Sequence, residues 1–594
     1  MIEPKRLFDC IEHQVQNSPL TDMLANKEGG VWKKYTTEQV KKAVNDLSAG
    51  LLDVGMSAND RTVEGRDKIA IISKNRPEWI ILDLAVQQIG AVLTPIYPTI
   101  NLKELEFVLN DAEVKLAFVN DEALYLKVLS LRDKLPFLQE IYSFEHVAGV
   151  KHWNTLIEKS TPELVEKVKH EAAKIQYDDL ATIIYTSGTT GTPKGVMLSH
   201  KNILSNVIAS LPCFPPGRNM KALSFLPLNH IFERMVSYIY LFNGTSIYYA
   251  EGLETIGDNL KEVRPNMFTT VPRLLEKVYD KIMLKGNKLN GIKRKLFYWA
   301  HGLAERFEIN KKLSVGYKLQ LALANKLVFN KWREALGNNI SCIVSGGAAC
   351  QVRLIRIFTA AGIIIMEGYG LTETSPVISV NRFDEEGRMF GSVGPLLDKV
   401  KVKIADDGEI LCKGPNVMMG YYKRDDLTAD SMIDGWYKTG DIGMMINNRF
   451  LKITDRKKEM FKTSGGKYVA PLPIENKFKE SAFIENIMVI GADQKYVGAF
   501  IVPSFPHLLE WCKNQNIPQL SNEDIIRNSK VLEFYKQIVE KFNVQFNHVE
   551  QIKRFELLPY EWTVETGELT PKLSLKRKVV MEKYRDQAHR IYQD

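Results

Sequence analysis

The chain has 594 residues, of which 45% are hydrophobic and 25% charged, and its formal net charge is +8. This is ordinary globular composition, which excludes a disordered or collagen-like chain and leaves room for several compact units. The mild positive charge favours anionic small molecules or an anionic membrane surface as partners, and no feature indicates nucleic acid.

The six cysteines are scattered, with no CxxC pair and no Cys/His cluster. This pattern argues against a disulfide framework or a structural zinc site and predicts a reducing, cytoplasmic location. The N-terminal sequence MIEPKRLFDC has no apolar core of a signal peptide. Trp79–Tyr97 comes closest to a membrane span, but it carries Asp83 and two glutamines.

Short apolar runs alternate with amphipathic stretches of helical length. The runs are Lys68–Ser73, Leu116–Val119, Ala181–Tyr185, Met267–Val271, Cys342–Ser345 and Ile363–Glu367. The alternation predicts an α/β architecture with largely parallel sheets. Shorter, hairpin-like strands follow between Asp406 and Ile453, and the pattern restarts after Asp455–Lys458. We therefore predict a large N-terminal body of mixed sheets with flanking helices (1–454) and a small α+β C-terminal domain (459–594).

Residues 281–336 differ in character, because they form a helical insertion rich in lysine and arginine. The cations include Lys285, Lys288, Lys293, Arg294, Lys295, Lys311, Lys312 and Lys318. Two interpretations stay open. The insertion is either a solvated basic helix face or a surface for peripheral contact with an anionic membrane.

The most informative segment is Tyr185–His200, which reads YTSGTTGTPKGVMLSH. A buried strand feeds a turn in which glycines allow close backbone approach to phosphate oxygens. The Ser and Thr hydroxyls add donors, and Lys194 adds a cation. The order of a Walker A loop is absent, so this is a different kind of phosphate-binding loop.

This loop resembles that of the adenylate-forming superfamily, which includes acyl-CoA synthetases, luciferases and peptide-synthetase adenylation domains. The family's other motifs follow in the same order and cover most of the chain. The resemblance implies the adenylate-forming fold, ATP and coenzyme A as co-substrates, and Mg2+ as cofactor. It also implies a set of nucleotide contacts. These are Thr186, Ser187, Gly188, Thr189, Thr190, Gly191, Gly347, Ala348, Gly368, Tyr369, Gly370, Asp441 and Arg456.

Specific roles follow from the same resemblance. In the motif GYGLTETSP (368–376), Tyr369 stacks on adenine, Thr372 contacts the α-phosphate, and Glu373 helps to hold Mg2+ together with Thr186. Hard oxygen ligands shared with phosphate suit this ion. Residues 345–349 (SGGAA) line the adenine and acyl pocket. Lys194 neutralises phosphate charge, which attack by a carboxylate on phosphorus requires.

The segment DGWYKTGDIG (434–443) resembles the part of the family that binds ribose through a carboxylate, here Asp441, with Arg456 beside it. Lys458 occupies the family's hinge position, so residues 455–458 are expected to let the small domain rotate between two half-reactions. In the second conformation three residues of the 462–466 loop would face coenzyme A. These are Lys462, Ser464 and Gly465.

The substrate is narrowed by LPLNHIFER (226–234), which matches the family's acyl-pocket motif. His230 is either a contact near the acyl carboxylate or a satisfied core histidine, and Glu233 leaves open a partner for an amino group. Residues 434–471 and the basic insertion resemble long-chain acyl-CoA synthetases best. The expected reaction joins a fatty acid to ATP, giving acyl-AMP and pyrophosphate, and then to coenzyme A. Monomers and homodimers are both common among such enzymes.

One position departs from the family. Long-chain members carry a C-terminal lysine in a pattern like TPTxKxKR, where this chain reads TPKLSLKR (570–577) and places Ser574 at that lysine. Losing a charge-assisted contact in a transition state costs on the order of 3 kcal/mol, or about a hundredfold in rate. Three interpretations remain: Lys572 takes over the role, adenylation is slow, or the residue was altered.

Two other functions compete with the expected reaction. The first is a fatty acyl-AMP ligase, which passes the adenylate to a carrier protein. The second is a nucleotide- or acyl-binding relative with impaired adenylation, which only Ser574 supports.

Overall fold

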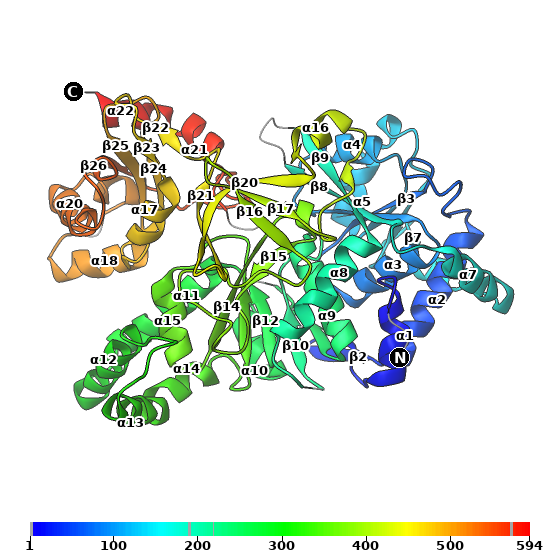
Figure 1. Ribbon diagram of the computed structural model, residues 1–594, viewed down its shortest axis with the longest axis horizontal. Coiled ribbons are helices and arrows are strands. Elements are labelled where there is room, and N and C mark those ends of the chain that lie inside the picture. Colours follow the sequence, from blue (N-terminus) through cyan, green and yellow to red (C-terminus); the bar gives the residue numbers. More distant parts are fainter. Residues whose placement is uncertain are drawn as a thin grey trace.

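The computed structural model describes residues 4–187, 192–217, 219–252, 254–518, 520–570 and 574–593. The N-terminal body holds two eight-stranded sheets and a five-stranded sheet, and the C-terminal domain lies at one end of the molecule (Figure 1). The predicted α/β fold with a large body and a smaller C-terminal domain is therefore confirmed.

The first sheet has the order β18-β9-β8-β4-β3-β5-β6-β7. Its strands from β8 to β7 pair in parallel, and β9 and β18 add an antiparallel edge. The bounds are β3 (Lys68–Ile72), β4 (Val92–Ile96), β5 (Val114–Val119), β6 (Glu140–Ser143), β7 (Lys151–His152), β8 (Leu180–Ser187), β9 (Pro193–Ser199) and β18 (Gly420–Tyr421).

The second sheet has the order β15-β14-β13-β12-β10-β11-β1-β2. It is parallel from β14 to β1, and β15 and β2 form antiparallel edges. The bounds are β1 (Leu24–Glu28), β2 (Val31–Tyr35), β10 (Lys221–Ser224), β11 (Ser246–Tyr249), β12 (Met267–Thr270), β13 (Cys342–Ser345), β14 (Ile364–Gly370) and β15 (Val377–Val380).

Helices α3 (Pro77–Gln88) and α9 (Ile231–Asn243) belong to the same buried core as strands of both large sheets. Nearly every residue of these two helices is buried, including Asp83 of α3 and the charged pair Glu233 and Arg234 at the start of α9. The other helices of the first 210 residues are α1 (Asp9–Asn17), α2 (Thr37–Asp53), α4 (Leu102–Asp111), α5 (Glu122–Leu129), α6 (Asn154–Ile157), α7 (Pro162–Lys174) and α8 (His200–Ser210).

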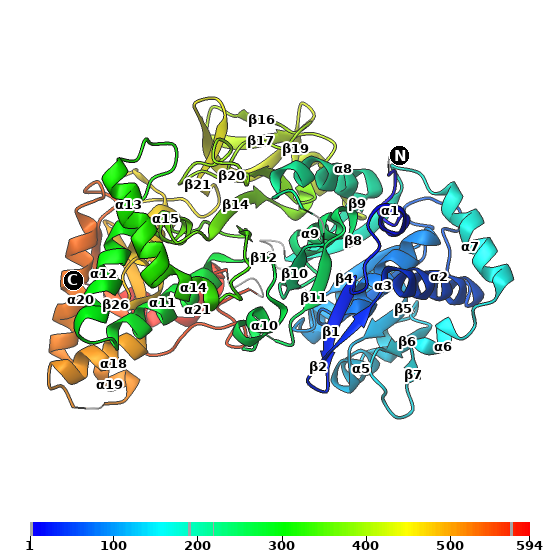
Figure 2. The same ribbon diagram turned by 90° about the horizontal axis from the view of Figure 1, so that it is seen from below.

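The far face of the second sheet carries a separate helical layer with its own core (Figure 2). Its helices are α10 (Ile256–Val263), α11 (Pro272–Asn287), α12 (Gly291–Glu305), α13 (Val315–Ala324), the π-helical turn η3 (Asn325–Phe329), α14 (Asn330–Glu334) and α15 (Val352–Ala360). The basic insertion at 281–336 thus runs from the second half of α11 through α12, α13 and η3 to α14. No helix of the described residues is long and apolar enough to cross a membrane.

The smaller elements complete the chain. The five-stranded sheet contains β16 (Lys401–Ile404), β17 (Glu409–Lys413), β19 (Met432–Ile433), β20 (Trp436–Ile446) and β21 (Phe450–Arg456), with α16 (Asp425–Asp430) beside it. The C-terminal domain contains β22 (Phe461–Lys462), β23 (Tyr468–Val469), β24 (Ile484–Ile490), β25 (Val497–Pro503) and β26 (Ile552–Leu557). Its helices are α17 (Pro471–Phe478), α18 (Phe505–Asn514), α19 (Asn522–Ile525), α20 (Ser529–Asn543), α21 (Arg577–Lys583) and α22 (Arg585–Tyr592).

Candidate functional site

The predicted phosphate-binding loop starts at the end of β8. Tyr185 anchors this end, because its hydroxyl donates to Asp111 Oδ2 at 2.5 Å. The antiparallel pairing of β8 and β9 sets Thr186 opposite Lys194. Four predicted contacts, Gly188, Thr189, Thr190 and Gly191, lie outside the described residues, and Ser187 is described only in its backbone.

Lys194 is linked to Glu373 through an aromatic side chain. The Lys194 ammonium lies 5.2 Å from the centre of the Tyr421 ring, and the Tyr421 hydroxyl donates to Glu373 Oε1 at 2.9 Å. Glu373 lies on the 3-10 turn η4 (Thr372–Thr374), beside the buried Thr372. The Glu373 carboxylate is half-buried, and the Lys194 cation lies on the other side of the Tyr421 ring. A carboxylate that can bind a metal ion and a cation that can bind phosphate are the two charges that suit a metal-bound triphosphate.

A second cluster joins three predicted nucleotide contacts. Tyr369 donates its hydroxyl to Asp441 Oδ2 at 2.8 Å, and Arg456 Nε lies 3.2 Å from Asp441 Oδ1. Pairing of β20 with β21 sets Asp441 opposite Arg456. The Asp441 side chain is 5% exposed and that of Arg456 59%. Burial raises the pKa of the Asp441 carboxyl, and the Arg456 charge and the Tyr369 hydroxyl oppose this shift.

The glycines of this region have different roles. A Cβ on Gly370 would lie 1.7 Å from the Pro376 carbonyl oxygen, so the tight turn after β14 requires glycine. Gly347 has a φ of +80°, which also favours glycine, and it lies in the turn with Ala348 after β13. A Cβ on Gly368 would meet its nearest neighbour at 3.5 Å, which is an ordinary contact, so packing does not require glycine there.

One buried carboxylate in this turn was missed by the sequence analysis. Glu367 precedes Gly368 on β14, and its Oε1 accepts the Cys350 backbone N–H at 2.8 Å. Burial raises the pKa of Glu367 to about 7. This hydrogen bond joins β14 to the end of the SGGAA turn. The only feature of the sequence that could have indicated Glu367 is its place as an acidic residue directly before the glycine-rich motif.

The acyl-pocket motif is held by asparagine side chains. Asn75 donates to the Leu226 carbonyl at 2.7 Å and accepts the Leu228 N–H at 2.9 Å, while Asn229 donates to the Ile96 carbonyl at 2.6 Å. His230 then caps α9, since its Nδ1 accepts the Phe232 N–H at 3.1 Å. The motif therefore bridges the two large sheets.

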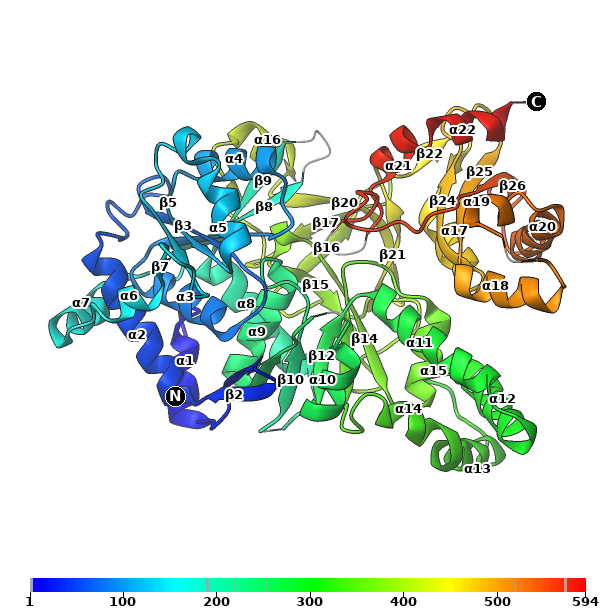
Figure 3. The same ribbon diagram turned by 180° about the vertical axis from the view of Figure 1, so that it is seen from behind.

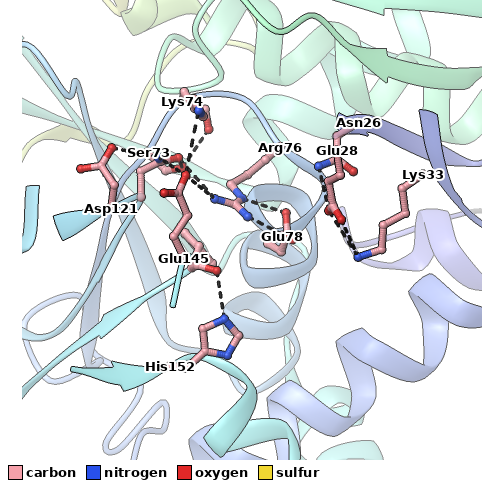
Figure 4. A network of polar contacts seen from close by, with 12 residues as sticks. Asn26, Glu28, Lys33, Ser73, Lys74, Arg76, Glu78, Asp121, Glu145 and His152 are labelled. Carbon is pink, nitrogen blue, oxygen red and sulfur yellow. Dashed lines mark hydrogen bonds and ion pairs between the residues drawn. The ribbon is translucent and has the colours of Figure 1, made fainter. Parts of the chain in front are cut away.

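Asn75 is itself positioned by a polar network at the ends of β3, β5 and β6. Ser73 donates to Asn120 Oδ1 at 3.0 Å, and Asn120 donates to Glu145 Oε1 at 3.1 Å. Arg76 Nε lies 2.8 Å from Glu78 Oε2, and Figure 4 shows this pair close to Ser73 and Glu145. The network fixes both sides of the segment that carries Asn75.

Glu233 and Arg234 of the same motif point into the core. Arg234 forms a fully buried ion pair with Asp83 of α3 and also donates to Thr182 Oγ1 at 2.7 Å. Glu233 accepts a hydrogen bond from the Thr269 hydroxyl. Burial raises the pKa of Glu233 to about 7, and the hydroxyls of Ser224 and Thr269 oppose this shift. Glu233 is thus 1% exposed and committed to a core contact.

The remaining predicted residues lie where the body meets the C-terminal domain or within the C-terminal domain itself. Lys458 is exposed in the turn after β21, and Lys457 beside it pairs with Asp407 and Glu409 of the body at 2.6 and 2.7 Å. Lys462, Ser464 and Gly465 are exposed in the β22–β23 hairpin. Space is open at Gly465, whose nearest neighbour to an added Cβ is 3.9 Å away. Lys572 lies outside the described residues.

Ser574 is joined to Thr570 by two hydrogen bonds. Its carbonyl accepts the Thr570 N–H at 2.8 Å, and its own N–H donates to Thr570 Oγ1 at 3.1 Å. The segment before α21, drawn in red, extends from the C-terminal domain toward β20 (Figure 3). The position at which the sequence analysis expected a lysine is thus bonded to Thr570.

Together the fold and this arrangement define the class of the protein, which is an enzyme with a large N-terminal body and a smaller C-terminal domain. The chain belongs to the AMP-binding enzyme family: the family model matches residues 11–422, and the model of the AMP-binding enzyme C-terminal domain matches residues 459–594.

Among its relatives, the chain is similar to long-chain-fatty-acid–CoA ligase FadD15 of Mycobacterium bovis, with 33% identity over 95% of this chain and 93% of that protein. Long-chain-fatty-acid–CoA ligase 1 of Homo sapiens is 31% identical over 94% of this chain and 82% of that one. The solved structure of the anthranilate CoA ligase AuaEII with anthranoyl-AMP has the same fold, with a TM-score of 0.73, 16% identity and 97% coverage of both chains.

Proposed function

We propose that the protein activates a long-chain fatty acid with ATP and transfers the acyl group to coenzyme A. The observation that carries this function is a pair of polar groups, Lys194–Tyr421–Glu373 and Tyr369–Asp441–Arg456, in a chain that is about one third identical to long-chain-fatty-acid–CoA ligases. The two groups lie near each other, because the Arg456 charge interacts with Glu373. A carboxylate oxygen of the fatty acid attacks the α-phosphorus, and the bond to pyrophosphate breaks. The coenzyme A sulfur then attacks the acyl carbon and AMP leaves.

Each group has a defined part in this reaction. Asp441 accepts the ribose hydroxyls, because a carboxylate offers more acceptor sites than Tyr369 and Arg456 occupy. The bond to Asp441 fixes the Tyr369 ring for stacking on adenine. Lys194 and Thr372 bind phosphate oxygens and stabilise the charge that develops there. The oxygens of Glu373 and Thr186 suit Mg2+, which supplies charge neutralisation when it is bound with the triphosphate.

His230 is proposed to lie near the acyl carboxylate. Its Nδ1 accepts a backbone N–H, so in the neutral ring the proton is on Nε2, which can donate. The body is proposed to end at residue 454, with a hinge at 455–458 around Lys458. Rotation there would bring Lys462, Ser464 and Gly465 to coenzyme A. Lys572 is proposed to supply the cation that Ser574 lacks.

The basic insertion is proposed as a site of peripheral membrane contact at the cytoplasmic face. Four apolar side chains spaced by four residues form one stripe along α13 and η3, and they are 75%, 68%, 49% and 43% exposed. In order, these are Val315, Leu319, Leu323 and Leu327. Exposed lysines flank the stripe at 311, 312, 318 and 326. An apolar stripe between cations suits an anionic bilayer surface.

The experiment that tests the function is incubation with ATP, Mg2+, coenzyme A and fatty acids of graded length, followed by assay of AMP, acyl-AMP and acyl-CoA. We expect AMP and acyl-CoA in equal amounts. Acyl-AMP without thioester would identify a fatty acyl-AMP ligase instead, and no AMP with any acid would identify a binding protein. Pyrophosphate release by Lys572→Ala and Ser574→Lys tests the lysine: an unaffected Lys572→Ala variant contradicts its proposed role.

A further inference from the structure

The C-terminal end of α17 docks against the body. Gln351, which precedes α15, donates through Nε2 to the Lys479 carbonyl at 3.3 Å, and Arg353 Nη2 donates to the Glu480 carbonyl at 3.1 Å. The last carbonyls of a helix have no partner within the helix, and a cation there is favourable. The body therefore caps a helix of the other domain.

An ion pair extends this contact. Arg273 in the first turn of α11 pairs with Glu485 at the start of β24. Arg273 Nη1 also lies 3.0 Å from Glu276 Oε2, and Glu276 Oε1 accepts from Gln351 at 3.0 Å. The Arg273 and Glu485 side chains are 16% and 19% exposed, so water screens them less than an ordinary surface pair. We call these residues (Arg273, Gln351 and Arg353 with Lys479, Glu480 and Glu485) the docking contact.

The body side of the docking contact continues directly into the candidate site. Gln351 follows Cys350, whose N–H is held by Glu367 just before the GYG motif. Arg273 lies two residues after Val271, which is the neighbour that a Cβ on Gly347 would meet, at 4.0 Å. The orientation of the C-terminal domain is therefore connected to the SGGAA turn through two short backbone segments.

In this orientation the β22–β23 hairpin is exposed, and the chain just before α21, drawn in red, reaches toward the body (Figure 3). Resting on the proposed function, we propose that the docking contact holds the C-terminal domain in the orientation that serves acyl-adenylate formation, and that it must separate before coenzyme A reacts. Arg273, Gln351 and Arg353 are thus positioning residues, which act through the placement of the other domain.

The test reverses the ion pair one side at a time and then both together, as Arg273→Glu, Glu485→Arg and the double variant. Adenylation is followed as acid-dependent exchange of pyrophosphate into ATP, and thioester formation is followed from supplied acyl-AMP and coenzyme A. We expect each single reversal to slow exchange about tenfold or more, because it replaces the attraction of a partly buried pair with repulsion between two like charges. Thioester formation should be unchanged or faster, and the double variant should recover exchange.

Arg356→Glu is the matched control. Arg356 lies on α15 with a similar exposed fraction, but its partner at 3.0 Å is Glu308 of the body. This variant should leave the ratio of the two half-reactions unchanged. If a charge-reversal variant does not fold, Glu485→Gln is used in its place, because it removes the charge with little change of shape.

Domain orientation is measured independently by distances between labels at Ile292→Cys and Val544→Cys, which are 75% and 79% exposed in the body and the C-terminal domain. Single reversals should broaden this distribution and the double variant should narrow it again. Equal loss of both half-reactions with an unchanged distribution would overturn the proposal. If the wild type shows no acid-dependent exchange, the proposed function is refuted. The label distances would still show whether the docking contact sets the orientation of the C-terminal domain.

Discussion

Two ion pairs tie different parts of this protein together, and their surroundings differ. Asp83–Arg234 joins α3 to α9 between the large sheets, and both side chains are 0% exposed. Arg273–Glu485 joins the body to the C-terminal domain, and its side chains remain 16% and 19% exposed. A buried charge needs its partner permanently, whereas a charge that reaches water can exchange its partner for solvent. The buried pair Asp83–Arg234 therefore suits a part of the body that does not move, which we call the fixed frame. The partly exposed pair Arg273–Glu485 suits a contact that can separate.

Breaking the core pair should have the largest effect. Asp83→Ala leaves the Arg234 guanidinium buried with only neutral neighbours such as Thr182 and Tyr238, and it removes the acceptor of the Tyr238 hydroxyl. We expect a loss of about 3–5 kcal/mol in the free energy of unfolding, measured by urea denaturation of the full chain. Arg356→Glu, in a half-exposed pair, is the control. A loss below about 1 kcal/mol would show that the core pair does not differ from a surface pair.

Glu233 extends the comparison to a buried carboxylate with no cation. Its pKa is raised to about 7, and its neighbours Tyr240 and Tyr249 have pKa values raised well above the usual range, so they stay neutral. A raised carboxyl pKa stabilises the folded state below the unfolded pKa of about 4.3, and this contribution is lost as the pH rises to about 7. The loss amounts to roughly 4 kcal/mol.

Glu233→Gln should therefore flatten the decline of stability between about pH 4.3 and 7. Urea midpoints measured across this range check the prediction. Glu367, whose pKa is also about 7, stays in the variant and contributes its own decline. An identical pH dependence in wild type and Glu233→Gln would mean that Glu233 is not protonated in the folded protein.

The Asp441–Arg456 pair combines both kinds of surroundings, since the Asp441 side chain is nearly buried while that of Arg456 is largely exposed. Asp441→Asn keeps the shape and removes the charge that would accept the ribose hydroxyls. Hydrogen bonds to a charged group contribute about 1.5–3 kcal/mol, so KM for ATP should rise roughly ten- to hundredfold. Thermal unfolding without nucleotide serves as the control. A KM unchanged for ATP would contradict the ribose contact.

Sequence reasoning reaches the fold and the groups on strand ends, because motifs such as GYGLTETSP fix local backbone and chemistry together. It does not find contacts between segments far apart in the chain. In the sequence Asp83 is only a charge that interrupts an apolar run, yet in the fold it is the partner of Arg234. Glu233 leaves open a contact with an amino group, but the fold buries it against Thr269. The docking contact likewise depends on how two domains meet, which no local pattern encodes.

The smallest effect is expected at the neutral member of the docking contact. Gln351→Leu keeps the side-chain volume but removes one donor to the Lys479 carbonyl and one to Glu276. Each neutral hydrogen bond contributes about 1 kcal/mol, so the ratio of adenylation to thioester formation should fall about fivefold. The urea midpoint should hardly change, because each domain keeps its own core. A lower midpoint with an unchanged ratio would place Gln351 with the fixed frame, as a residue that stabilises the body and does not control how the C-terminal domain is held.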